Sequence, residues 1–159
     1  MIALDLNLVC KLPPGVVLVP FIPEHLNGFK FEQPDMQGHD DISNHTIAQA
    51  HGNTAVSVIQ YGKTLGIFGS SKVWNGLEEA WFLVDEVTRR YGIAMTKVAK
   101  KFIQLKFQED MLNRLQITVR CSDNRAYKWA KCLGFQTDGV MRQFGPDGSD
   151  YYMMAITKD

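Results

Sequence analysis

Apolar residues along this chain follow a period of two in its middle part and a helical period in two later segments. Short β-branched or apolar runs between turn residues predict strands at 16–21, 54–61, 64–73, 79–84 and 115–121. The Gly62-Lys63 pair predicts a hairpin between the second and third of these runs. The run at 79–84 is almost wholly apolar, which is typical of a strand that is buried on both faces.

The helical period first appears at about 87–108. Spacings of four and three residues there predict one buried helical face, formed by Tyr91, Met95, Val98, Phe102 and Leu105. A second helix is predicted at 123–133, with Ser122 or Asp123 as its N-cap and Gly134 as its C-terminal stop. Its predicted buried face consists of Ala126, Trp129, Ala130 and Leu133.

The remaining segments complete a one-domain plan. Short helices are predicted at 23–26 and 41–51, and a closing hairpin at 137–144 and 150–157. Pro13, Pro14 and Gly15 interrupt the chain early, so we expect residues 1–15 to form an N-terminal arm, with 1–12 as a candidate extra strand, and residues 16–159 to form a single domain. Helices that alternate with strands in the second half favour an α/β or mixed-sheet fold.

Composition and charge narrow the function classes. Apolar residues make up 45% of the chain and the formal net charge is zero, which is typical of a globular protein without an excess of charge for nucleic acid. The three cysteines, Cys10, Cys121 and Cys132, form no C-x-x-C pair, so we expect a reducing cytoplasm rather than disulfides. Neither a membrane span nor a signal peptide is expected from the apolar runs.

Gly92 raises the main chemical question, because glycine within a helix costs about 1 kcal/mol relative to alanine. A strand that runs into a helix leaves free backbone N–H groups at the helix start, and these bind phosphate. A diphosphate must approach such a backbone closely, which residues as small as Gly92 and Ala94 permit, and Arg89 and Arg90 add positive charge. The alternative is that Gly92 only lets the helix pack closely on the sheet, and the bulk of Tyr91 favours that alternative.

Two motifs resemble a known family. Arg89-x-x-Gly92-x-Ala94 resembles the Q/R-x-x-G-x-G/A motif of the GCN5-related N-acetyltransferase (GNAT) superfamily. The segment 123–135, DNRAYKWAKCLGF, resembles the later family segment N-x-x-A-x-x-F-Y-x-K-x-G-F. The likeness covers about 54–157 and is weaker over 16–53. Within the superfamily, the chain is most similar to short GNAT-like proteins of T7-type phages that are associated with virion morphogenesis.

The resemblance implies a fold, a cosubstrate and a reaction. The fold is a mixed, mostly antiparallel sheet with splayed central parallel strands, flanked by helices. Acetyl-CoA lies between those strands, and an amine, from a small molecule or a protein, attacks its thioester directly. The residues implied in cosubstrate binding are Leu83, Val84, Arg89, Arg90, Tyr91, Gly92, Ile93, Ala94, Asn124 and Tyr127. A phage-encoded protein acts in the host cytoplasm or in the virion, and the edge of the last hairpin offers a surface for a homodimer.

The catalytic positions depart from the family pattern. Many members protonate the departing thiolate with a tyrosine on the last helix, where this sequence has Ala130. Tyr127 is the nearest phenol and is our candidate acid, whereas Glu79, with Glu78 beside it, is our candidate base. The departure supports an alternative, namely a GNAT-fold protein of weak or absent activity that acts in phage virion assembly or binds a host protein.

Other polar groups receive plainer interpretations. The lysines of the long helix indicate a solvated face, with binding of nucleic acid or of the adenosine phosphate as the alternative; they are Lys97, Lys100, Lys101 and Lys106. His39, His45 and His51 are six residues apart and share no helical face, so no metal site is predicted. Trp81 is expected in the core or at an edge, or else as a lining of the substrate groove.

Overall fold

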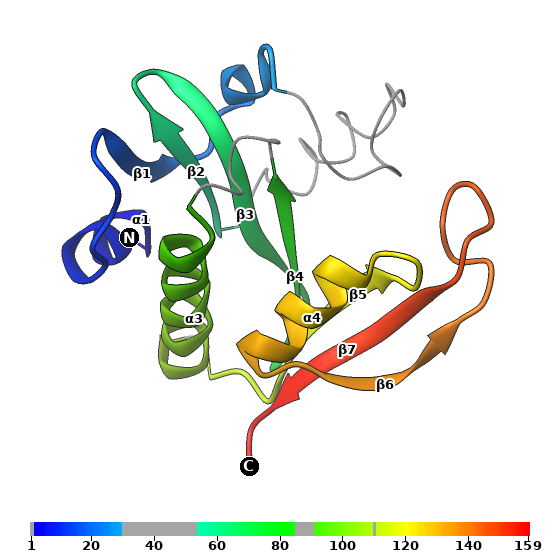
Figure 1. The fold of residues 1–159 in the computed structure, drawn as a ribbon. Helices are drawn as coiled ribbons and strands as arrows, with labels where there is room; N and C mark the ends of the chain where they lie inside the picture. The colour runs from blue at the N-terminus through cyan, green and yellow to red at the C-terminus, as the bar shows by residue number, and fades with distance from the viewer. Residues whose placement is uncertain (1, 30–53, 85–90, 110) are drawn as a thin grey trace.

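The computed structural model describes residues 2–29, 54–84, 91–109 and 111–159 of the chain (Figure 1). Its sheet has seven strands in the order β1-β2-β3-β4-β5-β7-β6. The strands are β1 (Val16–Pro20), β2 (Thr54–Gln60), β3 (Lys63–Trp74), β4 (Leu77–Val84), β5 (Arg114–Arg120), β6 (Gln136–Met141) and β7 (Tyr151–Thr157). Neighbours pair antiparallel except β4 and β5, which are parallel. The predicted mixed, mostly antiparallel sheet is therefore confirmed.

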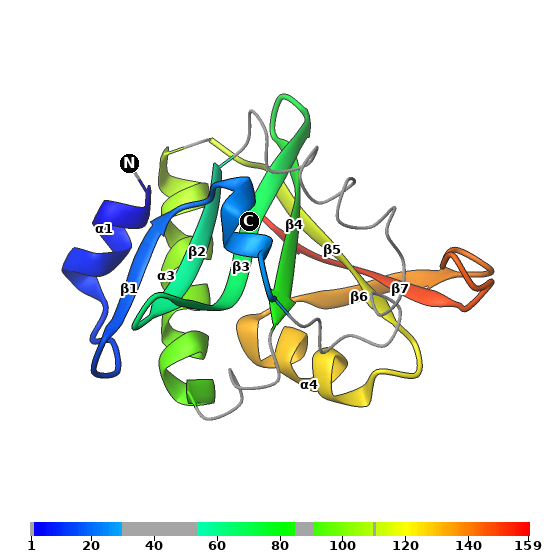
Figure 2. The same ribbon diagram turned by 90° about the horizontal axis from the view of Figure 1, so that it is seen from above.

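Two long helices cover one face of this sheet. They are α3 (Gly92–Glu109) and α4 (Asn124–Leu133), and Figures 1 and 2 show them side by side on that face. The short helices are α1 (Ile2–Val9) and η1 (Pro23–Leu26). We call the side of α3 and α4 the helix face, to which β4 contributes Ala80 and Phe82, and we call the opposite side the far face. Because side chains alternate along a strand, Glu79, Trp81 and Leu83 belong to the far face.

The first residues of the chain form a helix, so the extra strand considered for 1–12 is wrong. Ala3 and Leu6 of α1 are buried against β1 and α3. The side chain of Asn7 donates from Nδ2 to the carbonyl of Leu18, at 2.6 Å, and accepts from the amide of Leu18, at 3.0 Å. β1 is an edge strand, so Asn7 occupies backbone groups that a further strand would otherwise pair with.

The interior is divided into two clusters along the helix face. The first joins α1, β1, β2, β3 and α3, and the second joins β5, β7 and α4. Met95, Val98 and Phe102 of α3 are buried in the first cluster, as their period predicts. Each fully buried large apolar side chain contributes about 1.5–3 kcal/mol, so these contacts fix α3 beside β3 and β4.

Helix α4 begins and ends as its sequence predicts. Asp123 caps it, because its Oδ1 accepts a hydrogen bond from the amide of Ala126 at 3.0 Å. Gly134 ends it with a φ of 103°, a conformation that disfavours other residues. The amide of Phe135 then bonds to the carbonyl of Ala130 at 3.1 Å. These caps set where the chain leaves α4 for the final hairpin.

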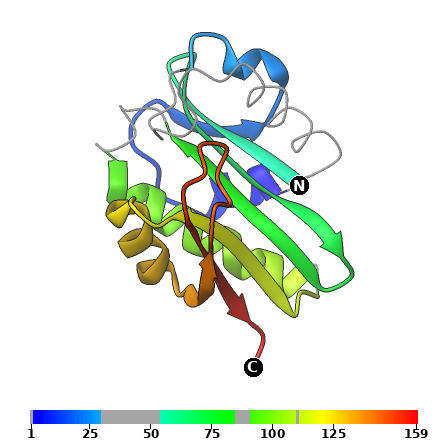
Figure 3. The same ribbon diagram turned by 90° about the vertical axis from the view of Figure 1, so that its right-hand side faces the viewer.

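The final hairpin is confirmed, with β6 at the edge of the sheet (Figure 3). Its strands are shorter than predicted, because 142–150 forms a structured turn. The predicted helix at 41–51 lies outside the described residues, as do the histidines at 39, 45 and 51 and the arginines at 89 and 90. No helix in the described ranges combines the length and the hydropathy that crossing a bilayer requires.

Candidate functional site

The sheet opens between its two parallel strands. β4 and β5 pair only at Leu77↔Arg114, Glu78↔Leu115 and Glu79↔Gln116. β4 then continues along β3 to Val84, and β5 continues along β7 to Arg120. Figure 2 shows the two strands moving apart beyond their paired ends. The splayed central strands that the sequence led us to expect are therefore present.

The backbone of β4 determines how a ligand can use this opening. A Cβ added to Gly66 would lie 3.2 Å from the carbonyl oxygen of Leu83, so that carbonyl is directed at β3. Backbone groups of successive residues point to opposite sides of a strand, so alternate residues of β4 direct theirs toward β5. An extended ligand in the opening can pair with β4 as a further strand would. The carbonyl of Leu83 itself therefore faces β3, away from the opening.

The head of α3 is uncovered at Gly92. A Cβ added to this residue would meet nothing within 4 Å, so packing among the described residues does not require glycine here. The close-packing alternative for Gly92 therefore has no support in the structure. The hydroxyl of Thr96 donates to the Gly92 carbonyl at 2.7 Å, and the amides of this first turn have no acceptor within the helix. Ile93, in the same turn, is 78% exposed.

The ring of Tyr91 packs against the core rather than over the amides at the start of α3. Its hydroxyl accepts a hydrogen bond from Nε2 of Gln60 at 2.8 Å, and its ring packs against the first hydrophobic cluster. The ring is thus held against β2 and the core. Ala94 packs against the same cluster. Of the residues implied in diphosphate binding, Gly92 and Ile93 are the exposed ones in the described range.

Trp129 connects α4 to the head of α3 and to β4. Its Nε1 donates to the Thr96 hydroxyl at 2.9 Å, and its ring lies 5.4 Å from that of Phe82. The head of α3 is therefore held beside the part of β4 that has separated from β5. The sequence placed Trp129 on a buried helical face but did not indicate this linking role.

Tyr127, the candidate acid, faces the other side of α4. Its hydroxyl accepts from Oγ1 of Thr137 at 3.3 Å, and its ring lies 5.0 Å from that of Tyr152. These contacts direct the phenol toward β6 and β7. Ala130, which occupies the usual tyrosine position of the family, is buried in the second cluster. Asn124 is exposed at the start of α4.

Glu79, the candidate base, lies at the closed end of the opening. Nε2 of Gln116 donates to Oε2 of Glu79 at 3.1 Å, and Oε1 of Gln116 accepts from Nε of Arg114 at 3.0 Å. Arg114 is also ion-paired with Asp138 of β6 at 2.6 Å. A carboxylate only accepts and a guanidinium only donates, so the Gln116 amide can take just one orientation. Glu79 is therefore held by a row of polar side chains that reaches the sheet edge.

Glu78, the neighbouring carboxylate, makes its contacts on the opposite face of the sheet. It is ion-paired with Lys106 of α3 at 2.8 Å and accepts from the hydroxyl of Ser70 at 2.5 Å, on the helix face. Glu78 is 8% exposed and Lys106 is 4% exposed. Lys106 therefore does not belong to a solvated basic face, contrary to the sequence-based interpretation, whereas Lys97 and Lys100 are exposed. Of the two glutamates, Glu79 is the better placed to meet a ligand.

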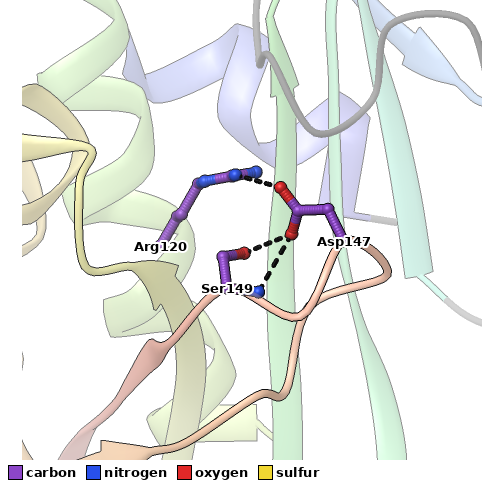
Figure 4. A network of polar contacts seen from close by, with 3 residues as sticks. All are labelled: Arg120, Asp147 and Ser149. Atoms are coloured by element: carbon purple, nitrogen blue, oxygen red, sulfur yellow. Dashed lines mark hydrogen bonds and ion pairs between the residues drawn. The ribbon is translucent and has the colours of Figure 1, made fainter.

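A second polar cluster ties the turn of the final hairpin to the end of β5 (Figure 4). Arg120 is ion-paired with Asp147, and Ser149 donates to Oδ1 of Asp147 from its hydroxyl, at 2.5 Å, and from its amide, at 3.1 Å. The bonds from Ser149 and Arg120 lower the pKa of Asp147 to about 2. The sequence showed a turn here but not its attachment to β5.

Cys121, just after β5, is half-buried, and burial together with the nearby Asp150 carboxylate raises the pKa of its thiol. A raised pKa disfavours the reactive thiolate, which agrees with a structural role. Within the described residues, no three or more metal-binding side chains gather in one place.

Comparison with known proteins gives a clear result for structure alone. No family model matches the chain, and no curated protein matches it in sequence. Ard1 from Thermoplasma volcanium is similar in structure, with a TM-score of 0.74, 18% identity, and coverage of 90% of this chain and 97% of that one. A GNAT-family acetyltransferase from Bacillus anthracis has a TM-score of 0.70, 16% identity, and coverage of 93% and 97%.

A third similar structure is the ribosomal-protein-S5-alanine acetyltransferase from Vibrio fischeri. It has a TM-score of 0.67, 13% identity, and coverage of 95% of this chain and 97% of that one. The TM-scores establish a shared architecture. At identities this low, the activity must be argued from the site. The chain has the fold of the GNAT acetyltransferases over nearly its whole length.

Proposed function

We propose that this protein is an N-acetyltransferase that uses acetyl-CoA as its cosubstrate. One observation carries the proposal: the sheet opens between β4 and β5 beside an uncovered helix head at Gly92. The first feature suits an extended amide-containing arm, and the second suits a diphosphate. Trp129 holds the two features side by side, which supports their use by one ligand of this kind.

The residues at the opening fit that ligand. Amides at Gly92 and Ile93 would bind the diphosphate, and a side chain larger than a methyl group at position 92 would occupy the space that the diphosphate needs. Backbone groups of β4 beyond its last pair with β5 would bond to the amide-containing arm. Arg89 and Arg90 keep the role that the sequence motif gives them, as a source of positive charge. Acetyl-CoA supplies an acetyl group activated as a thioester.

Glu79 would act on the amine. An amine that is protonated at neutral pH must lose a proton before it can attack, and Glu79 can accept that proton at the closed end of the opening. The amine nitrogen then forms a bond to the acetyl carbon, the carbon–sulfur bond breaks with its electron pair leaving on the thiolate, and the nitrogen loses its second proton to water, which leaves a neutral amide. Gln116 holds the Glu79 carboxylate in a fixed orientation for this role.

The departing thiolate receives less assistance than in many GNAT enzymes. Ala130 has no proton to give, and the contacts of Tyr127 are with Thr137 and Tyr152. A positioned acid contributes typically about 10²–10⁴ in rate. We therefore propose slow transfer, in which the thiolate takes its proton from water, and we keep Tyr127 as the acid to be tested.

The lack of a proton donor at Ala130 also favours a second candidate, a GNAT-fold protein that has lost most of its activity. The sequence resemblance to T7-type phage proteins gives this candidate a setting in virion assembly or in the binding of a host protein. Turnover separates the two candidates. Release of coenzyme A above background with a broad panel of amines supports the enzyme, and its absence supports the second candidate.

Binding of acetyl-CoA is tested by thermal shift. Ligand at 100 times its dissociation constant should stabilise the fold by about 2.7 kcal/mol. Gly92→Glu should abolish the shift, because its carboxylate would occupy and repel the diphosphate site. Gly92→Ala is the matched control: its Cβ has room at the first position of α3, so it should leave the shift with ligand in place. The proposal fails if the wild-type protein shows no shift.

A further inference from the structure

Two polar atoms near Glu79 are buried without a hydrogen-bond partner among the residues that the structure describes. They are Oγ of Ser71 and Nε1 of Trp81. Buried donors in proteins almost always have a partner, because an unmade bond leaves the cost of removing the group from water uncompensated. Both residues as wholes are only half-buried, so these donors lie just below the surface. An orphaned pair of this kind indicates a ligand or an ordered water.

Both atoms belong to the far face, together with Glu79. Ser71 of β3 is directly opposite Glu79 in the antiparallel ladder, and Trp81 follows Glu79 by two positions on β4. Opposite residues have Cβ atoms roughly 4.5–5.5 Å apart, and alternate residues of a strand are roughly 6.5–7 Å apart. The carboxylate and the two donors therefore form one group at the closed end of the β4–β5 opening.

The chemistry of the group is specific. The indole N–H of Trp81 can only donate, and the hydroxyl of Ser71 can donate. Glu79 can only accept while it is ionised, and Gln116 fixes its orientation. A matching ligand presents an N–H group to Glu79 and an oxygen acceptor to Trp81 and Ser71. A protonated alkylamine or polyamine satisfies only the first requirement, because it has no acceptor.

We infer that the acceptor substrate is an α-amino compound, in which a carbonyl or carboxyl group follows the carbon that bears the amine. The amine of such a compound lies at Glu79, and its oxygen accepts from Trp81 and Ser71. The N-terminus of a peptide and a free amino acid both have this chemistry. The inference rests on the proposed function for the transfer of the acetyl group, but the binding mode is tested without turnover.

The indole N–H of Trp81 provides a direct spectroscopic test. The chain has three tryptophans, so Trp81→Phe assigns this resonance by removing it from the ¹H–¹⁵N spectrum of the full chain. Saturating alaninamide, with and without coenzyme A, should move the resonance downfield as the hydrogen bond forms. sec-Butylamine has an ethyl group where alaninamide has the carboxamide, so it should leave the Trp81 resonance unmoved. The inference is overturned if alaninamide leaves it unmoved or if both amines move it equally.

Kinetics of matched substrates give a second test. Trp81→Phe keeps an aromatic side chain but removes the N–H group, so kcat/KM for alaninamide should fall roughly three- to tenfold, the value of one net hydrogen bond. The pH-independent kcat/KM for sec-butylamine should not change. Trp74→Phe is the control, since Trp74 is 64% exposed, and it should leave both substrates unchanged. Equal losses for both substrates with Trp81→Phe would contradict the inference.

The two failures are distinguishable. A downfield shift of Trp81 with alaninamide, without any turnover, would reject the proposed acetyl transfer and retain the amine site. Turnover of both amines with equal efficiency and an unmoved Trp81 resonance would retain the transferase and reject the substrate class.

Discussion

Glu78 and Glu79 are adjacent carboxylates on one strand, and their contacts differ between the two faces of the sheet. On the helix face, Glu78 is ion-paired with Lys106 and bonded to Ser70 in a buried, fully engaged cluster. On the far face, within the described part of the chain, Glu79 accepts from the amide of Gln116 and stands beside two donors that have no partner. A satisfied buried cluster fixes structure, whereas an unsatisfied one is available to a ligand.

Removal of the Glu79 charge should have the largest effect on activity. Glu79→Gln keeps the shape and removes the base, so the rate of acetyl transfer should fall by about 10²–10⁴. The free energy of unfolding should change by less than about 1 kcal/mol, because Glu79 is partly exposed and its hydrogen bond to Gln116 is of the ordinary kind. Steady-state kinetics and urea unfolding of the same preparation measure both. An unchanged rate would remove Glu79 from the mechanism.

The buried pair should show the reverse pattern. Lys106→Met leaves Glu78 buried without its counter-charge, which typically costs about 3–5 kcal/mol. Urea unfolding measures this loss. The double variant with Glu78→Leu should regain much of it, because an apolar pair no longer contains an isolated charge. If Lys106→Met costs less than the Glu79→Gln control, the contrast between the two faces does not hold.

A smaller, pH-dependent effect is expected from His25, which lies on the far face with Ser57. Nδ1 of His25 accepts from the amide of Ile22 at 3.2 Å, so the hydroxyl of Ser57, 2.8 Å away, must donate to it. Burial lowers the pKa of His25 below its usual 6.5, because it disfavours the charged ring, and both hydrogen bonds require the neutral ring. The resulting stability is complete above pH 6.5 and is lost as the pH falls through the lowered pKa.

Urea midpoints between pH 7.5 and 5 measure this dependence. His25→Leu should remove its share of the fall in stability on acidification, and a histidine titration followed by NMR should show a pKa below 6.5. A value at or above 6.5 would mean that the Ser57 contact does not hold the neutral ring.

The exposed cluster of the hairpin turn should give the smallest effect. The pKa of Asp147 is about 2, so its contribution to stability is present above 3.8 and is lost as the pH falls toward 2. Ser149→Ala removes the hydrogen bond that contributes most to the lowered pKa of Asp147, so that pKa should rise, as measured from the carboxyl carbon by NMR. Ser122→Ala, outside the cluster, should leave it unchanged. A pKa that does not respond to Ser149→Ala would contradict the described contacts.

Most of the fold follows from the sequence because its signals are local. Period, caps and turn residues placed α4 and the strands to within a few residues, from Asp123 and Gly134 in particular. The first helix did not follow, since Pro13 and Pro14 marked a break without showing what packs before it. Its place depends on the distant contact of Asn7 with Leu18, which no local pattern contains.

The candidate site followed only in part, for a similar reason. The motif around Gly92 indicated an anion site, and the structure leaves space at that residue. The different roles of Glu78 and Glu79 depend on which face each side chain occupies, and a wholly apolar strand pattern does not settle that. The links of Trp129 to Thr96 and of Gln116 to Glu79 join separate elements and leave no trace in sequence spacing.

Calorimetric titration with acetyl-CoA tests the central claim most directly, namely that the head of α3 and the β4–β5 opening form one cosubstrate site. The wild-type protein should bind one equivalent, and Gly92→Ala should bind with an affinity within a few fold of it. Gly92→Glu should bind at least about 100-fold more weakly, because two like charges about 4 Å apart near a protein surface repel by roughly 4 kcal/mol. Binding that is absent in the wild type, or equal in Gly92→Glu, would contradict the claim.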